Sequence, residues 1–208
     1  MNINYCAVNE SRTYILNKIQ PIKKSNANFK VIDIGGTVTG WSQPIVDFVV
    51  DINSTDDSKN FKFDICSADQ WNKLKNYVAL YGKFDYCICT HTLEDLYNPV
   101  VTLDILPLIA HAGVITMPSA KTELSHIESQ EYLGYIHHRW LFGVEDGRMV
   151  VAPKLNFLDS LVRPGFNQRT EIRYEWEQYV SYKMFMNNYL GPTVDHVVNS
   201  YKLFLSKQ

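Results

Sequence analysis

The chain has 208 residues, of which 46% are apolar and 20% are charged, and its formal net charge is -2. This length predicts one domain or one domain with an appendage, and the charge excludes a general attraction to nucleic acid or anionic membranes. No apolar run approaches the roughly 18 residues of a membrane span, and the first segment, MNINYCAVNESR, lacks the features of a signal peptide. We therefore expect a cytoplasmic protein with no membrane or nucleic-acid partner, and its oligomeric state stays open.

The first 118 residues divide into a polar segment and an alternating α/β region. Residues 1–28 are mainly polar, and a helix is predicted over Arg12–Ile19, ending before Pro21. Residues 29–118 alternate short apolar strands with helical stretches, which is typical of a parallel sheet with right-handed crossovers. The predicted strands are Lys30–Asp33, Phe48–Asp51, Phe61–Asp64, Phe84–Thr90 and Val114–Met117, and the predicted helices are Ala68–Tyr81 and Leu93–Ala110.

Residues 119–208 follow a different pattern. The Asp-Gly pair at 146–147 lies between two apolar runs and predicts a β-hairpin. Alternating side chains predict a further strand over Thr170–Trp176, and helical spacing after Pro192 predicts a last helix over Thr193–Leu205. The expected fold is α/β, a doubly wound, mostly parallel Rossmann-like sheet with a C-terminal antiparallel extension.

Two of the four cysteines form a Cys-X-Cys pair. Cys87 and Cys89 alternate within FDYCICT, so both side chains are expected on one face of the predicted strand. Such a pair can bind a metal ion, but neither Cys6 nor Cys66 completes a ligand set at a familiar spacing. Buried, reduced thiols are therefore the favoured interpretation, and a disulfide framework is not expected.

Acidic residues end the first three predicted strands, at Asp33, Asp51 and Asp64. The carboxyl ends of parallel strands meet at one edge of the sheet, where ligands bind in open α/β folds. The turn after the first strand, GGTVTG at 35–40, has neither the lysine of a P-loop nor the glycine spacing of a dinucleotide-binding turn. The pattern weakens the case for a dinucleotide phosphate site and is compatible with a cofactor that has ribose and adenine but no phosphate. Asp51 is well placed for the ribose hydroxyls.

Four blocks in this order, VIDIGG, VVDI, FDICSADQW and KFDYCICTHTLEDLYNP, resemble the class I S-adenosylmethionine-dependent methyltransferases over residues 29–118. The resemblance implies that Gly35 and Gly36 lie along the methionine part and ribose of the cofactor. It also implies that Asp51 bonds the ribose, that Asp64 lies near the adenine amine, and that Asp33 orients the turn and the methionine amino group. The implied cofactor-binding set is Asp33, Gly35, Gly36, Asp51, Ile52, Asp64, Ile65, Thr90 and His91.

The sequence departs from the family pattern at three positions and in one element. Thr37 and Thr39 stand at usual glycine positions of the turn, and Asp95 replaces a second histidine. Pro44 leaves little room for a long first helix before the next strand. Asp95 and its neighbour Glu94 are expected in the first turn of the helix that is predicted from Leu93, where acids favour the helix dipole.

Three histidines, His91, His137 and His138, are the candidate catalytic residues. His91 follows the fourth strand near the expected sulfonium, where it would contact the cofactor or accept a proton; capping a helix is the alternative. His137, His138 and Arg139 form a cluster suited to binding an anionic or hydroxylated acceptor. The alternative is that one histidine bonds the backbone and Arg139 pairs with an acid.

The sequence predicts no metal site, because His126, Glu131, His137 and His138 match no recognised ligand spacing. The predicted function is methyl transfer from S-adenosylmethionine to a small-molecule or glycan acceptor, which residues 119–208 would bind. Two alternatives stay open. One is a catalytically inactive methyltransferase-like binding or assembly module, and the other is a nucleotide-sugar or nicotinamide-dependent enzyme.

Overall fold

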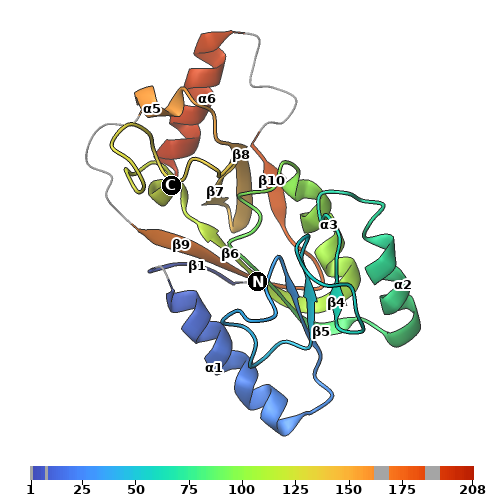
Figure 1. Ribbon diagram of the computed structural model, residues 1–208. Coiled ribbons are helices and arrows are strands. Elements are labelled where there is room, and N and C mark those ends of the chain that lie inside the picture. The colour runs from blue at the N-terminus through green and yellow to red at the C-terminus, as the bar shows by residue number, and fades with distance from the viewer. Residues whose placement is uncertain (1, 8, 162–168, 186–192) are drawn as a thin grey trace.

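The computed structural model describes residues 2–7, 9–161, 169–185 and 193–208. The strands of its large sheet are β1 (Asn2–Ala7), β2 (Val31–Ile34), β3 (Phe48–Val50), β4 (Asn60–Phe61), β5 (Phe84–Thr90), β6 (Ala110–Pro118) and β9 (Thr170–Glu177). This seven-stranded sheet has the order β1-β9-β6-β5-β2-β3-β4. Strands β2 to β6 pair in parallel, and β9 pairs antiparallel with β6 and with β1. The fold is therefore mixed α/β with a large, mostly parallel central sheet (Figure 1).

Helices cover both faces of the large sheet (Figure 1). Those on the large sheet are α1 (Glu10–Ser25) on one face and α2 (Asn72–Tyr81) and α3 (Pro99–Ile109) on the other. Helices α4 (Ala120–Glu123), α5 (Leu158–Leu161) and α6 (Val194–Ser206) contribute to a separate apolar cluster with β7 and β8. In β5, Tyr86 and Ile88 belong to the apolar cluster that includes α1, whereas Cys87 and Cys89 belong to the cluster that includes α2 and α3. Successive side chains of a strand point to opposite faces, which explains this division. The shared face of the two cysteines is confirmed, and all four cysteines are free and buried.

The predicted hairpin forms in a second, three-stranded sheet. Strands β7 (Trp140–Glu145) and β8 (Arg148–Pro153) pair antiparallel, and β10 (Tyr182–Met184) pairs parallel with β8. The turn residues have positive φ angles, 51° at Asp146 and 70° at Gly147, as tight hairpins require. The hairpin therefore does not extend the large sheet, which gains its antiparallel strands from β9 and from β1 at its edge.

Helix α1 differs from its predicted bounds because it continues past Pro21 to Ser25. Proline lacks an amide hydrogen and clashes with the carbonyl four residues earlier, which usually ends a helix. Here Ile15 and Ile19 are fully buried against the sheet and Ile22 packs beside them, so the apolar face continues beyond the proline. The prediction that the helix ends before Pro21 was wrong because packing outweighs this local preference.

The helix predicted from Leu93 begins only at Pro99, so the prediction was wrong for its first part. The residue before a proline is disfavoured in the helical region, and Asn98 accordingly has φ -140° and ψ 82°. Residues 91–98 instead form a series of turns. Glu94 and Asp95 therefore lie in a loop, not in the first turn of a helix.

The remaining elements agree with the sequence to different degrees. Strand β9 and helix α6 lie close to their predicted bounds, and Pro192 lies outside the described residues. Strand β1 was missed because residues 1–28 carry no clear alternating pattern. The division into residues 1–28, 29–118 and 119–208 stays a prediction. Among the described residues, no helix is long and apolar enough to cross a membrane.

Replacing Pro21 by alanine should stabilise the protein by about 2 kcal/mol. The substitution restores an amide donor for the carbonyl of Asn17 and removes the ring clash, while some of this gain is offset by a freer unfolded chain. Urea unfolding would measure the difference. Thr13→Ala, at another exposed position of α1, should change stability by no more than about 0.7 kcal/mol. Equal stability of Pro21→Ala and the natural chain would show that α1 carries no strain at the proline.

Candidate functional site

The first cleft of the candidate site lies beyond the carboxyl ends of β2, β3, β4 and β5 and has a volume of about 290 Å³. It is lined by Gly35, Asp51, Ile52, Phe63, Asp64, Ile65, His91, Thr92, Asp95 and Leu96, and we call it the aspartate cleft. Gly35, Asp51, Ile52, Asp64, Ile65 and His91 of the predicted cofactor set are thus brought together. None of the described residues that line this cleft is lysine or arginine.

The glycine turn is pressed against the edge of the sheet. The amide of Gly35 donates to the carbonyl of Val50 at 2.7 Å, and the φ angle of Gly35 is 78°. A Cβ atom would collide with the side chain of Thr92 if added at Gly35, and with the carboxylate of Asp33 if added at Gly36. Both positions therefore need glycine, and the turn lies directly over the Asp33 carboxylate.

Asp33 lies beneath the turn and does not line the cleft. Its residue is 2% exposed, its Oδ2 accepts a hydrogen bond from the Ser42 hydroxyl at 2.5 Å, and its Oδ1 has no hydrogen-bond partner. Burial raises the pKa of Asp33 to about 6, against the lowering effect of the Ser42 hydrogen bond and with a smaller contribution from the charge of Asp51. An unpaired buried carboxylate oxygen is costly, and a ligand with a donor group would relieve that cost.

The other two predicted aspartates are held by their own loops. Oδ1 of Asp51 accepts a hydrogen bond from the amide of Asn53 at 2.7 Å, and Oδ1 of Asp64 accepts one from the amide of Cys66 at 2.8 Å. Bonds of this kind from an aspartate to the backbone two residues later stabilise tight turns. Each carboxylate is therefore held in place at the cleft by one of its oxygen atoms.

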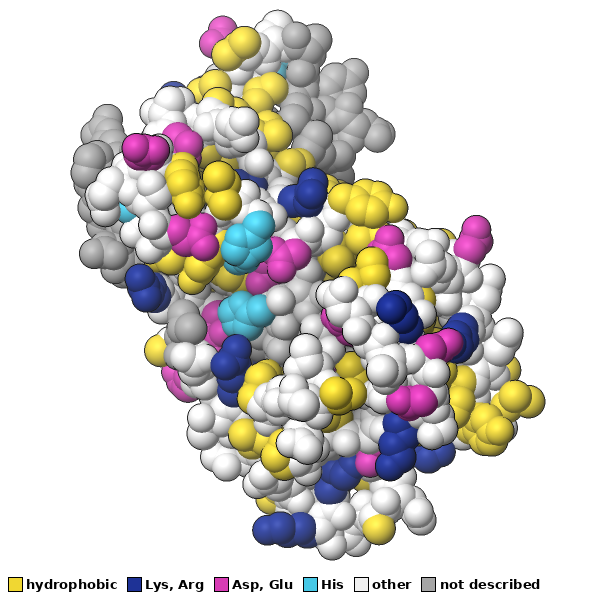
Figure 2. Space-filling view, viewed as in Figure 1, with side chains coloured by type: hydrophobic (Ala, Val, Ile, Leu, Met, Phe, Trp, Pro, Cys, Tyr) yellow, Lys and Arg dark blue, Asp and Glu magenta, His cyan; other side chains and the backbone are white. Residues whose placement is uncertain are grey.

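A second cleft adjoins the first and has a volume of about 330 Å³. We call it the histidine cleft; its lining is Asn9, Arg12, His91, Glu94, Asp95, Pro118, Thr122, Glu128, Tyr135, His137, His138, Thr170 and Glu171. His91 and Asp95 line both clefts, so the two cavities share a wall. Histidine side chains lie beside acidic ones in the middle of the face shown in Figure 2. The structure therefore brings the three predicted catalytic histidines to one cleft.

Besides Asp33 and Gly36, two further predicted site residues, Thr90 and Arg139, line neither cleft. Thr90 ends β5, and its carbonyl accepts a hydrogen bond from the Thr92 hydroxyl at 3.1 Å. Arg139 is exposed, and its backbone amide donates to the carbonyl of Glu94 at 2.7 Å. Thr90 and Arg139 thus contribute through backbone groups, which help to shape the loop that carries Glu94 and Asp95.

His91 is held between two buried acids. Its Nε2 lies 2.8 Å from Oε2 of Glu171, and its Nδ1 lies 3.4 Å from Oε1 of Glu94 in an ion pair that lacks hydrogen-bond geometry. Burial by itself would lower the pKa of His91, but the interactions with Glu171 and Glu94 outweigh it and raise the pKa to about 9. Burial acts to raise the pKa of Glu171, yet its bonds with His91 and Ser11 lower it overall. His91 is therefore an imidazolium at neutral pH.

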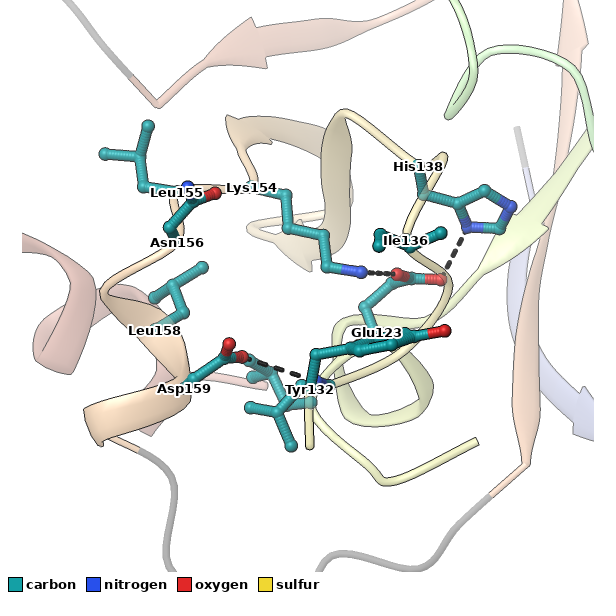
Figure 3. Close-up of a pocket in the computed structure, with 11 residues that line it drawn as sticks. Glu123, Tyr132, Ile136, His138, Lys154, Leu155, Asn156, Leu158 and Asp159 are labelled. Carbon is teal, nitrogen blue, oxygen red and sulfur yellow. Dashed lines mark hydrogen bonds and ion pairs between the residues drawn. The ribbon is translucent and has the colours of Figure 1, made fainter. Parts of the chain in front are cut away.

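His138 is held from the opposite side of the histidine cleft. Its Nδ1 lies 2.7 Å from Oε1 of Glu123, and Nζ of Lys154 lies 2.7 Å from Oε2 of the same residue (Figure 3). The Glu123 side chain is only 1% exposed. Burial lowers the pKa of His138, but Glu123 and the acids of the neighbouring loop raise it overall. The free nitrogen, Nε2, lies 3.6 Å from Oδ1 of Asp95.

Sequence reasoning missed the acids that hold the histidines. Glu94 was assigned to a helix, Glu171 only to the strand predicted over Thr170–Trp176, and Glu123 received no role. All three are buried. Glu171 and Glu123 contact histidines that are 80 and 15 positions away in sequence, and Glu94 lies beside His91, which is three positions before it. The signal available in the sequence was the proline at 99, which predicts that Glu94 precedes the helix.

No protein-family model matches the chain, and no curated protein does either. A solved structure described as the high-resolution (2.2 Å) crystal structure of WbdD is similar with a TM-score of 0.34 and 12% sequence identity. The similarity covers 55% of this chain and 30% of that chain, so it spans well under two thirds of WbdD. Similarity at this level carries no functional argument.

The elevated pKa of His91 predicts a pH-dependent stability. The folded-state pKa is about 9 and the ordinary value is 6.5, so the stabilising contribution is complete below about pH 6.5 and is lost as the pH rises through 9. An NMR titration should show His91 titrating near pH 9 in the natural protein and at lower pH in Glu171→Gln. The natural protein should also lose more stability than the variant between about pH 6 and pH 10.

Glu177→Gln provides the matched control, because Glu177 is exposed at the other end of the same strand. It should leave the titration of His91 unchanged. A His91 signal that titrates near 6.5 in the natural protein would contradict the charged state assigned here.

Proposed function

We propose that the protein is a class I S-adenosylmethionine-dependent methyltransferase that acts on a small-molecule or glycan acceptor. The observation that carries the proposal is the aspartate cleft, where a glycine turn and acidic residues meet without a lysine or arginine in the lining. The proposal takes the large sheet to be doubly wound, with β3 and β4 on one side of β2 and with β5 and β6 on the other. The cleft then lies where the strand order reverses, which is where open α/β sheets bind ligands.

The residues of the aspartate cleft fit a cationic adenosine cofactor without phosphate. Asp51 would accept hydrogen bonds from the ribose hydroxyls, and Asp64 would accept one from the adenine amine. Asp33 would take the methionine amino group, directly or through water, because its Oδ1 has no hydrogen-bond partner in the described structure. When bound, S-adenosylmethionine supplies a methyl group on a sulfonium for in-line transfer.

A phosphate-bearing cofactor fits the same cleft poorly. Pyrophosphate sites use lysine, arginine or the N-terminus of a helix that directly follows a glycine turn. Between β2 and β3 the described chain forms turns and no helix, and the cleft is lined by acids. Nicotinamide and nucleotide-sugar chemistry is therefore the weaker alternative for this site.

His91 has a positioning role in this proposal. An imidazolium whose pKa is about 9 does not accept a proton from an acceptor at neutral pH, so general-base catalysis does not suit it. It instead joins the loop after β5 to Glu171 on β9 and fixes the wall shared by the two clefts. His137 and His138 stay the candidates for acting on the acceptor.

The histidine cleft suits a hydroxylated acceptor. Both carboxylate oxygens of Glu94 are buried without a hydrogen-bond partner, and Glu128 and Glu171 line the same cleft. Acceptor-only groups of this kind pair with hydroxyl donors, which sugars and other polyols supply. Holding such an acceptor in line with the donor can contribute about 7–11 kcal/mol to catalysis in favourable cases.

Calorimetry with S-adenosylmethionine, S-adenosylhomocysteine and NAD tests the proposal. The first two should bind with micromolar affinity, and NAD should not bind, because the aspartate cleft offers no partner for pyrophosphate. Asp51→Ala should abolish binding of the first two, since it removes the acceptor for the ribose hydroxyls. Asp69→Ala, at an exposed aspartate outside the cleft, should leave binding unchanged.

Each alternative predicts a different result in the same experiment. Binding of NAD alone would favour a nicotinamide enzyme, and binding of none of the three would favour an inactive binding or assembly module. Unchanged binding of S-adenosylmethionine in Asp51→Ala would contradict the assigned ribose contact.

A further inference from the structure

We propose that Asp95, His137 and His138 bind a divalent transition metal of the zinc class at the boundary between the two clefts. Nε2 of His138 lies 3.6 Å from Oδ1 of Asp95, and Nε2 of His137 lies 3.8 Å from the same oxygen. The ligand atoms of the three residues all lie within 4.8 Å of one another. Two imidazoles and a carboxylate form a ligand set of catalytic zinc sites, in which the fourth position is open. The sequence predicted no metal because Asp95 is 42 positions or more from the histidines.

The spacing needs only small adjustments to close around an ion. Zinc–nitrogen and zinc–oxygen bonds of about 2.0–2.2 Å in a tetrahedron place the ligand atoms about 3.4 Å apart. The side chains of Asp95 and His137 are 45% and 57% exposed, so both can move by the required distance without disturbing the core. His126 and Glu131, which the sequence offered as ligands, are not part of the cluster.

The hydrogen bond between His138 and Glu123 is an independent observation that favours a metal. Metal-binding histidines typically donate one ring N–H to a carboxylate, which fixes the ring and directs the other nitrogen at the ion. Glu123 holds Nδ1 of His138 at 2.7 Å, and Nε2 faces Asp95. Lys154 binds the second oxygen of Glu123 and compensates its buried charge (Figure 3). The buried pair thus has the arrangement of a carboxylate–histidine–metal support.

The two chain segments that carry the ligands are held together by two hydrogen bonds to backbone carbonyls. The amide of Arg139 donates to the carbonyl of Glu94 at 2.7 Å, and Nε1 of Trp140 donates to the carbonyl of Leu96 at 2.6 Å. These bonds flank Asp95 on one segment and follow the two histidines on the other. The ring of Tyr135 also packs against both histidine rings. The three ligands are therefore brought together by the fold itself, before any ion binds.

The position of the site gives the metal a role that rests on the proposed function. Asp95 lines both clefts, whereas His137 and His138 line the histidine cleft and not the aspartate cleft. An ion with an open position there would bind an acceptor hydroxyl and lower its pKa, so that the hydroxyl would lose its proton to solvent water without a separate protein base. The alkoxide oxygen would then form the new O–CH3 bond as the S–CH3 bond of the sulfonium breaks, which leaves a neutral thioether. This role agrees with the protonated state of His91, which leaves it unable to act as that base.

Metal binding can be measured without either substrate. The full chain would be treated with chelator, dialysed, and titrated with Zn²⁺ by calorimetry and with Co²⁺ by visible spectroscopy. One ion per chain should bind, and Co²⁺ should give the intense absorption of a low-coordinate site, whereas Mg²⁺ should bind far more weakly because it prefers oxygen ligands. His137→Ala and Asp95→Ala should weaken Zn²⁺ binding by more than about 100-fold, and Glu123→Gln by about 10–100-fold.

His111→Ala is the matched control, since His111 is exposed near the start of β6 and lines neither cleft. It should bind Zn²⁺ as the natural protein does. Equal Zn²⁺ affinity in His137→Ala and the natural protein would overturn the site, as would an absence of Zn²⁺ and Co²⁺ binding. Calorimetry with S-adenosylmethionine on the same variants separates the two proposals, because either ligand can bind without the other.

Discussion

The hydrogen bond between His91 and Glu171 is the interaction on which the arrangement of the site depends. The backbone amide of His91 donates to the carbonyl of Thr116, which keeps the end of β5 beside β6. Glu171 lies opposite Pro118 in the antiparallel pairing of β9 with β6, so the start of β9 reaches the same edge of the sheet. The imidazolium–carboxylate pair thus joins the loop after β5 to the C-terminal region. His91, at this junction, lines both clefts.

Buried carboxylate oxygens without hydrogen-bond partners cost stability and indicate where ligands are expected. Oδ1 of Asp33 and both carboxylate oxygens of Glu94 are buried without hydrogen-bond partners. Buried polar groups in folded proteins are normally paired, and an unsatisfied one costs roughly 1–3 kcal/mol. Asp33 lies beneath the glycine turn, whereas Glu94 lines the histidine cleft. This separation agrees with a donor at one end of the site and a hydroxylated acceptor at the other.

The sequence predicted the aspartate cleft better than the histidine cleft, and the reason is physical. Asp51 and Asp64 each follow an apolar stretch that predicts a strand. Parallel pairing of these strands is then enough to bring the two aspartates to the same edge of the sheet. The contacts of His91 with Glu171 and of Lys154 with Glu123 join residues 80 and 31 positions apart. Such pairs depend on where β9 and the hairpin pack, and no local pattern specifies that. By contrast, the bounds of β5 were predicted correctly from the pattern of its own seven residues.

The absence of helical structure at residues 91–98 leaves backbone carbonyls of this loop available to the segment that carries the histidines. In a helix beginning at Leu93, the carbonyls of Glu94 and Leu96 would accept bonds from amides four residues later. They would then be poor acceptors for Arg139 and Trp140, whose bonds attach the segment before the hairpin to this loop. Pro99 and the positive φ angle of His91, 49°, keep the chain out of that helix. The same turns that expose backbone carbonyls therefore place Asp95 against the two histidines.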